Sequence, residues 1–338
     1  MAPESEDFKL SGPLHLTARS AIDWKKEDYT RSVVASLVQG VYVVERYRQK
    51  DGEGSQALAS PWWESFNFQM LEQLVDDDDS SIFGAIYKFE PPASHSNLST
   101  DGCPCYVIAF RGTLLKLKSG KRDLELDLDI IRNGLHLTSR FEIAMQAVRN
   151  KVASVGSSNV WLAGHSLGSA IALLAGKTMA KEGIFLETFL FNPPYPSVPI
   201  EKIPHKKVKY VIRGVGYASR AGLALAMKIK SGDPLKKESG DPLKAWAPYL
   251  FVNQYDHICS EYIGYFNCKK KMEKLGLGGV ERLTTQLSLK GVLMGNESEP
   301  MHRIPSANLS VNLTRSEQAH GINRWWRPDL LLSETLHY

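Results

Sequence analysis

The sequence predicts an α/β protein with a mainly parallel central sheet flanked by helices. From about residue 82 onward, short apolar segments alternate with amphipathic ones, which is typical of such a sheet. A buried strand, a glycine-rich turn and a helix-forming segment follow one another at residues 160–179. The 338 residues are enough for one large domain or two ordinary ones.

The period of the apolar residues predicts the individual elements. Strands are expected at residues 82–89, 106–110, 160–163, 185–191, 208–212 and 249–252. Helices are expected at residues 29–47, 62–74, 141–152 and 170–179. We therefore expect an N-terminal helical extension at 1–80 that packs on the core. An α/β domain at 81–338 follows, with an insertion near 214–248.

Charge and composition exclude several classes of protein. The net charge of +4 is too small to indicate nucleic-acid binding, and no nucleic-acid-binding motif is present. The first residues lack the pattern of a secretory signal, and no run of 18 apolar residues predicts a membrane-spanning helix. We therefore expect a cytoplasmic protein. We also expect free thiols at its four cysteines, which are Cys103, Cys105, Cys259 and Cys268.

The motif GHSLG at residues 164–168 is the strongest chemical signal in the chain. Its place between a strand and a helix is typical of a nucleophile elbow, a turn that forces strained backbone angles on Ser166. Strand and helix approach so closely that Gly164 and Gly168 leave no room for side chains. The serine oxygen then lies at the positive end of a helix. The alternative is a passive serine in a tight turn.

A nucleophile of this kind needs donors for the negative charge that develops on the substrate oxygen. The backbone N–H of Leu167, the residue after Ser166, is the first expected donor. The second is expected from a loop after another central strand. The strand YVIAF ends in Arg111, Gly112 and Thr113, and Thr113 offers both an N–H and a hydroxyl.

FRGT at residues 110–113 followed by GHSLG resembles the class 3 (fungal-type) lipase family of α/β hydrolases, over roughly residues 80–325. The whole chain most resembles plant class 3 lipase-like proteins, some of which carry a GDSL esterase label although their motif is GHSLG. The resemblance implies an α/β-hydrolase fold and hydrolysis of lipid esters by a Ser-Asp-His triad. It implies no metal or cofactor, and it matches Thr113 and Leu167 to the oxyanion positions.

Asp256 is the best candidate for the acid of this triad. It follows the strand-like segment YLFVN, and family members carry their acid at such a strand end. His-Ile-Cys follows the aspartate, where fungal members usually have Val-Pro, so the match is approximate. Asp233 and Asp241 are the alternatives, but both lie in polar Gly-Asp-Pro turns, which hold an imidazole poorly.

His320 is the best candidate for the base. It follows Asp256 in the required order, Gly321 gives its loop freedom, and Trp325 and Trp326 are expected to wall the site. His302 is the alternative base.

Two other histidines lie beside the proposed catalytic residues in the sequence. His165 adjoins Ser166, but its side chain is expected to point away from the serine oxygen. His257 adjoins Asp256 and cannot easily reach back to Ser166.

The substrate class is predicted less directly. Residues 114–130 occupy the position of the fungal lid but are highly charged, so a lid and a solvated loop both remain open. Residues 215–230 are partly apolar and end in lysines, which suits transient contact with an anionic membrane surface, although a helix packed on the core also fits. The expected ligand is an acyl ester or lipid.

A different class of function remains open. Some lipase-like plant proteins are thought to act as scaffolds that signal through protein partners. All the residue types of a triad and an oxyanion hole are present here, which favours an enzyme.

Overall fold

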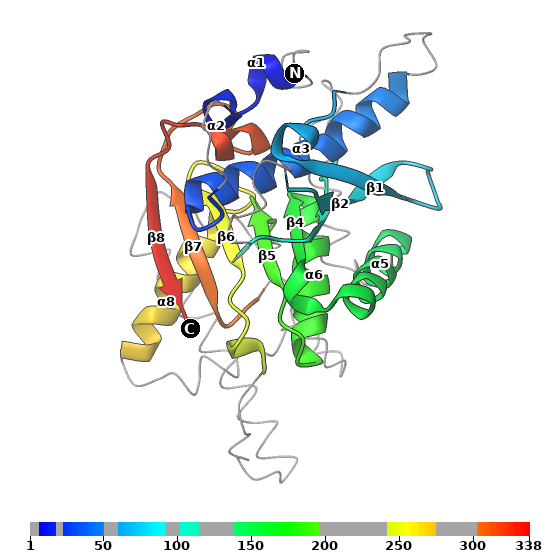
Figure 1. The fold of residues 1–338 in the computed structure, drawn as a ribbon. Helices are drawn as coiled ribbons and strands as arrows, with labels where there is room; N and C mark the ends of the chain where they lie inside the picture. Colours follow the sequence, from blue (N-terminus) through cyan, green and yellow to red (C-terminus); the bar gives the residue numbers. More distant parts are fainter. Residues whose placement is uncertain are drawn as a thin grey trace.

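The computed structural model describes residues 7–17, 23–50, 60–91, 102–114, 138–195, 242–274 and 303–338. An eight-stranded sheet forms its centre (Figure 1). Helix α3 lies across one face of the sheet, and α5, α6 and α8 lie on the other. The expected α/β architecture is therefore confirmed.

The strands stand in the sheet in the same order as in the chain. They are Phe68–Val75 (β1), Ile82–Phe89 (β2), Tyr106–Phe110 (β3), Val160–His165 (β4), Glu187–Phe191 (β5), Tyr249–Asn253 (β6), Ala307–Asn312 (β7) and Leu332–His337 (β8). The four pairs from β3 to β7 are parallel. The pairs β1–β2, β2–β3 and β7–β8 are antiparallel. The sheet is therefore mainly parallel, with antiparallel strands at both edges.

The helices in the described residues differ widely in length. They are Phe8–Ser11 (α1), Leu14–Thr17 (α2), Glu27–Lys50 (α3), Ser139–Val155 (α5), Leu167–Lys181 (α6) and Glu261–Lys274 (α8). Short 3₁₀ helices are Glu64–Phe66 (η3), Ser157–Asn159 (η6), Pro242–Lys244 (η8) and Ile322–Trp326 (η9). Helix α3 has acidic residues in its first turn and basic residues in its last, which complements the helix dipole. No helix in the described ranges is both long enough and apolar enough to cross a membrane.

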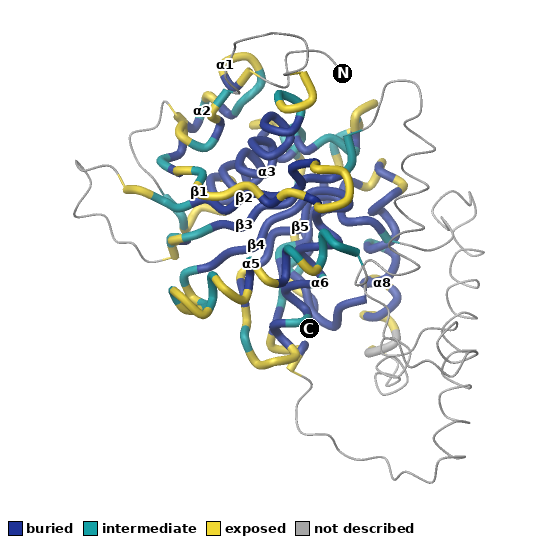
Figure 2. Tube along the Cα trace, turned by 90° about the vertical axis from the view of Figure 1, so that its right-hand side faces the viewer, coloured by how far each residue is buried: buried dark blue, intermediate teal, exposed yellow. Residues whose placement is uncertain are grey.

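The buried strands supply two hydrophobic cores, one on each face of the sheet. In β3, Val107 and Ala109 belong to the core under α3, whereas Ile108 and Phe110 belong to the core under α6. This alternation follows from the two-residue period of a strand. Figure 2 shows the central strands buried between the two helical layers. The parallel strands are therefore apolar on both faces, which is why their sequences are continuous apolar runs.

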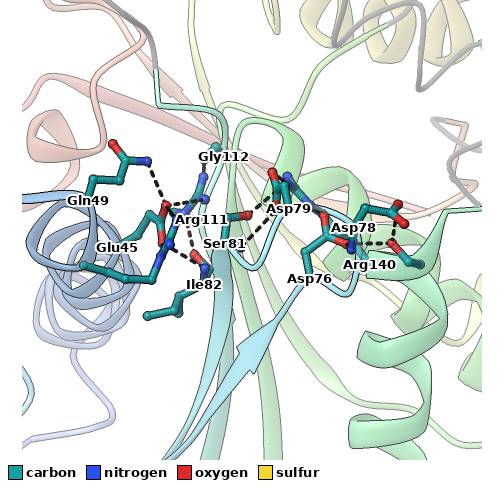
Figure 3. Close-up of polar contacts among 12 residues, drawn as sticks. Glu45, Gln49, Asp76, Asp78, Asp79, Ser81, Ile82, Arg111, Gly112 and Arg140 are labelled. Carbon is teal, nitrogen blue, oxygen red and sulfur yellow. Dashed lines mark hydrogen bonds and ion pairs between the residues drawn. The ribbon is translucent and has the colours of Figure 1, made fainter. Parts of the chain in front are cut away.

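An ion-pair cluster joins the turn between β1 and β2 to the start of α5. Arg140 of α5 forms salt bridges with Asp76 and Asp79, and Ser139 donates a hydrogen bond to Asp76 (Figure 3). The acidic run at residues 76–79 thus anchors helix α5 against the sheet edge.

One predicted element is wrong. The segment 62–74, expected as a helix, forms η3 and then strand β1, which pairs with β2. The change of direction occurs at Asn67, whose φ of 60° lies in the left-handed region that ends a helix. The sheet therefore begins within the first 80 residues, which are not wholly helical. The expected strand at 208–212 and most of the insertion at 214–248 lie outside the described residues.

Candidate active site

Four polar residues meet at the carboxyl edge of the sheet. Ser166 follows β4, Asn192 follows β5, Asp256 lies just beyond β6, and His320 lies between β7 and β8. The carboxyl ends of parallel strands share one edge, where α/β proteins commonly build their sites. The topology therefore brings together residues that are far apart in the sequence.

Ser166 occupies a strained turn between β4 and α6. Its φ of 54° and ψ of −124° are unusual for a residue with a side chain. A Cβ atom on Gly164 would lie 2.3 Å from the Gly168 carbonyl oxygen, and one on Gly168 would lie 2.3 Å from the Phe110 carbonyl oxygen. The expected strain and the lack of room at both glycines are confirmed.

Ser166, His320 and Asp256 form a continuous line of hydrogen bonds. Nε2 of His320 lies 2.9 Å from Oγ of Ser166, and its Nδ1 lies 2.7 Å from Oδ2 of Asp256. An ionised carboxylate only accepts hydrogen bonds, so Nδ1–H donates to Asp256 and a neutral His320 leaves Nε2 free to accept the serine proton. The structure thus brings together the three residues that the sequence analysis selected.

The carboxylate of Asp256 is almost completely buried and remains easy to ionise. Burial alone would raise its pKa, but the charge and hydrogen bond of His320 outweigh burial, so the pKa lies well below 3.8. Cys259 also donates a hydrogen bond, at 3.1 Å, and the Ile258 N–H donates to Oδ1. Asp256 is therefore held as an anion facing the imidazole.

Asn192 completes this environment and was not found from the sequence. Its side-chain amide donates to Oδ2 of Asp256 at 2.7 Å, and its own oxygen accepts a hydrogen bond from Nε1 of Trp325. Its φ of 47° is one that asparagine tolerates better than most residues. The available signal was its position directly after the buried strand FLF.

The two tryptophans beyond His320 have a different place from the one expected. Trp325 is completely buried and packs against Phe191 and Phe251. Trp326 is also buried, and its Nε1 donates to the Ser11 carbonyl. The expectation that they wall the site is wrong, because they belong to the core beneath it.

The loop after β3 lies directly against the nucleophile turn. A Cβ atom on Gly112 would lie 2.7 Å from the Cβ of Ser166, so only glycine fits at this contact. Thr113 follows and is partly exposed. Leu167 is the first residue of α6, where backbone N–H groups have no partner within the helix. Both expected oxyanion residues therefore lie close to the serine in the chain or in space: Leu167 is bonded to Ser166, and Thr113 follows Gly112, which lies against Ser166.

His165 is turned away from the serine hydroxyl, as expected. Its Nδ1 lies 2.8 Å from Oη of Tyr42 in α3, and its Nε2 lies 2.7 Å from the carbonyl oxygen of His320. Burial and, to a smaller extent, the neighbouring His320 together lower the pKa of His165 to about 3. His165 is therefore a neutral structural group, while the side chain of His257 is exposed.

The alternative triad residues, His302, Asp233 and Asp241, lie outside the described residues. So do the candidate lid at residues 215–230 and all but the first residue of the one at 114–130. Within the described ranges, no group of three or more His, Cys, Asp or Glu side chains is arranged to hold a metal ion.

A cavity in the described part of the chain lies away from these residues. It has a volume of about 950 Å³ and lies at the amino ends of the strands, on the α3 face, where Trp161, Glu187 and Tyr249 line it. None of the residues that form the hydrogen-bonded line lies on its wall.

Comparison with known proteins shows which family this chain resembles. The family model "Lipase (class 3)" matches residues 107–195, a segment that contains the whole of both FRGT (110–113) and GHSLG (164–168). A protein of Arabidopsis thaliana described as GDSL esterase/lipase At4g10955 is 53% identical over 342 residues, covering 97% of each chain.

Solved structures of lipases and esterases were also matched, at low similarity. A lipase from Rhizopus microsporus var. chinensis is 15% identical, with a TM-score of 0.29, over 50% of this chain and 58% of that one. A Rhizomucor miehei esterase is 14% identical, with a TM-score of 0.30, over 88% and 94%. The identity to the Arabidopsis relative is what decides the assignment: the chain belongs to the class 3 lipase family and has the α/β-hydrolase fold.

Proposed function

We propose that the protein is a serine esterase or lipase that cleaves carboxylic esters through Ser166, His320 and Asp256. The observation that carries the proposal is the 2.9 Å contact between Nε2 of His320 and Oγ of Ser166, with Nδ1 bound to a buried carboxylate. A nucleophile, a base and a group that orients the base are the parts that acyl transfer needs. Membership of a lipase and esterase family supports the same reaction class.

The first chemical step forms an acyl-enzyme. Oγ of Ser166 attacks the ester carbonyl carbon while Nε2 of His320 takes the hydroxyl proton. The tetrahedral intermediate collapses, the ester C–O bond breaks, and the imidazolium returns its proton to the departing alcohol. Asp256 stays ionised and stabilises the positive charge on His320.

The second step releases the acid. His320 takes a proton from water as the water oxygen attacks the acyl carbonyl, and then returns the proton to Ser166 as the acyl–oxygen bond breaks. In both steps, the N–H of Leu167 and the N–H or hydroxyl of Thr113 stabilise the oxyanion. Donors that are fixed before the reaction make this stabilisation large.

An acyl lipid is the proposed substrate class. The family match and the "GDSL esterase/lipase" description of the Arabidopsis relative support an ester of this kind. The alternative, an inactive scaffold, requires no hydrogen bond between the serine and the imidazole. The line of contacts from Ser166 to Asp256 therefore favours the enzyme.

The proposal is tested by the Ser166→Ala variant, assayed with p-nitrophenyl butyrate. Loss of the nucleophile should lower kcat by about 10⁴-fold or more. The free energy of unfolding should stay at the wild-type value. Ser36→Ala is the control, because it also removes a buried serine hydroxyl, one that donates to the Ser32 carbonyl inside α3. Undiminished turnover by the Ser166 variant would refute the proposal.

A further inference from the structure

We infer that Tyr42 of helix α3 is a positioning residue for the proposed hydrolysis. It holds the loop after β3 that carries Gly112 and Thr113, the oxyanion loop, at a fixed spacing from the loop that carries His320. The inference rests on the proposed function. It concerns a residue outside the segment that the class 3 lipase model matches, since that match begins at residue 107.

The directions of the hydrogen bonds around His165 follow from its chemistry. The carbonyl oxygen of His320 can only accept, so Nε2 of His165 carries the hydrogen of that 2.7 Å bond. Burial keeps His165 neutral, so its Nδ1 has no hydrogen and must accept. The hydroxyl of Tyr42 is therefore the donor in the 2.8 Å contact with Nδ1.

The same hydroxyl also accepts a hydrogen bond from the oxyanion loop. The N–H of Gly112 donates to Oη of Tyr42 at 2.7 Å. Three bonds thus run in one direction, from Gly112 to Tyr42, on to His165, and then to the carbonyl of His320. One hydroxyl group links the loop after β3 to the loop that carries the proposed base.

Helix α3 also helps to fix the carbonyl group of Gly112, through Glu45 and Arg111. Nη1 of Arg111 donates to the Gly112 carbonyl at 2.7 Å, and the guanidinium lies 3.8 Å from Glu45, which is nearly one helical turn beyond Tyr42 (Figure 3). A peptide unit is planar and trans, so its carbonyl and the next N–H point in opposite directions. Fixing the Gly112 carbonyl therefore fixes the direction of the Thr113 N–H.

This arrangement matters because acyl transfer needs donors and base at set distances from one carbonyl group. Small displacements of catalytic groups lower the rate strongly even where binding is unaffected. Removing the Tyr42 hydroxyl would leave the Gly112 N–H and His165 Nδ1 without this partner in a buried site. We therefore expect the loss of these two hydrogen bonds to lower kcat, the rate of the chemical step.

The test compares Tyr42→Phe with Tyr87→Phe. Tyr87 is completely buried, and its hydroxyl donates at 3.0 Å to the Leu37 carbonyl of the same helix. Both variants remove a buried hydroxyl between α3 and the sheet, but only Tyr42 contacts the proposed site. Kinetics with p-nitrophenyl butyrate are expressed per active site titrated with a fluorophosphonate, which removes any effect of misfolded protein.

We expect Tyr42→Phe to lower kcat about tenfold with KM unchanged, and Tyr87→Phe to leave kcat at the wild-type value. Wild-type kcat per titrated site in Tyr42→Phe would overturn the inference, as would equal losses in both variants. If Tyr42→Phe yields no titratable protein, His165→Asn carries the test with the same kcat readout, because it removes the ring that links Tyr42 to the His320 carbonyl. An unchanged kcat there overturns the inference. A wild type that neither hydrolyses the ester nor reacts with the fluorophosphonate would overturn the proposed function itself.

Discussion

The side-chain amide of Asn192 donates a 2.7 Å hydrogen bond to Oδ2 of Asp256, the same oxygen that lies 2.7 Å from Nδ1 of His320. The other end of the Asn192 side chain accepts from the indole of Trp325, which is completely buried. The proposed catalytic acid is therefore fixed to the hydrophobic core through one asparagine.

Replacing Asn192 with Asp should lower kcat for p-nitrophenyl butyrate at least tenfold. The change keeps an oxygen for Trp325 and a residue that tolerates positive φ, but it replaces the donor to Asp256 with a second negative charge. Asn308→Asp is the matched control, since its amide donates to the Ala247 carbonyl near the opposite end of the strands. Equal kcat values for the two variants would show that Asn192 has no role in holding the acid.

Asp256→Asn should lower kcat by about 10⁴-fold, because an amide no longer balances the positive charge on His320. Asp241→Asn should retain wild-type turnover. Steady-state kinetics of the two variants measure the difference. A large loss in Asp241→Asn with an active Asp256→Asn would assign the acid to the alternative residue.

His320→Ala should lose turnover, because Ser166 then lacks the base that lies 2.9 Å from its oxygen. His302→Ala should keep it. The comparison uses initial rates at equal concentrations of folded protein, judged by circular dichroism. If only the His302 variant is inactive, the base has been assigned to the wrong histidine.

Acidification should destabilise the fold through His165. Its pKa is about 3 when folded, against 6.5 as the ordinary value, so between these pH values the unfolded chain binds a proton that the folded chain does not. The free energy of unfolding therefore falls as the pH falls, by about 2 kcal/mol between pH 7 and pH 5 from this group. His337, whose pKa burial lowers to about 4, acts in the same direction.

Urea unfolding at pH 7 and pH 5 measures this effect. His165→Asn should reduce the difference between the two unfolding free energies by about 2 kcal/mol. An identical pH dependence in wild type and His165→Asn would contradict the neutral state assigned to His165.

The sequence was sufficient for the parallel centre of the fold, because strands buried on both faces are continuous apolar runs. It was insufficient at the edges. Strand β7 alternates apolar residues, Ala307, Leu309 and Val311, with polar ones, and β8 is only partly buried, so neither is a continuous apolar run like the central strands. Residues 62–74 place aromatic side chains at helix-like spacing, although Asn67 turns the chain and the remainder pairs as a strand.

The residues of the proposed site also differ in how far the sequence could predict them. Ser166 and its glycines could be predicted because the strand, turn and helix that shape them are contiguous. Tyr42 and Asn192 could not, because their roles depend on contacts with Gly112 and Asp256 that only the folded sheet creates. A tyrosine on the buried face of α3 is indistinguishable, from periodicity alone, from a core residue.

The most direct test of the central claim is to label the wild-type protein with a fluorophosphonate and map the modified residue by peptide mass spectrometry. The account predicts a single stoichiometric adduct on Oγ of Ser166, absent from the Ser166→Ala variant and much slower to form in His320→Ala. An unlabelled Ser166, or a label on another residue, would contradict it.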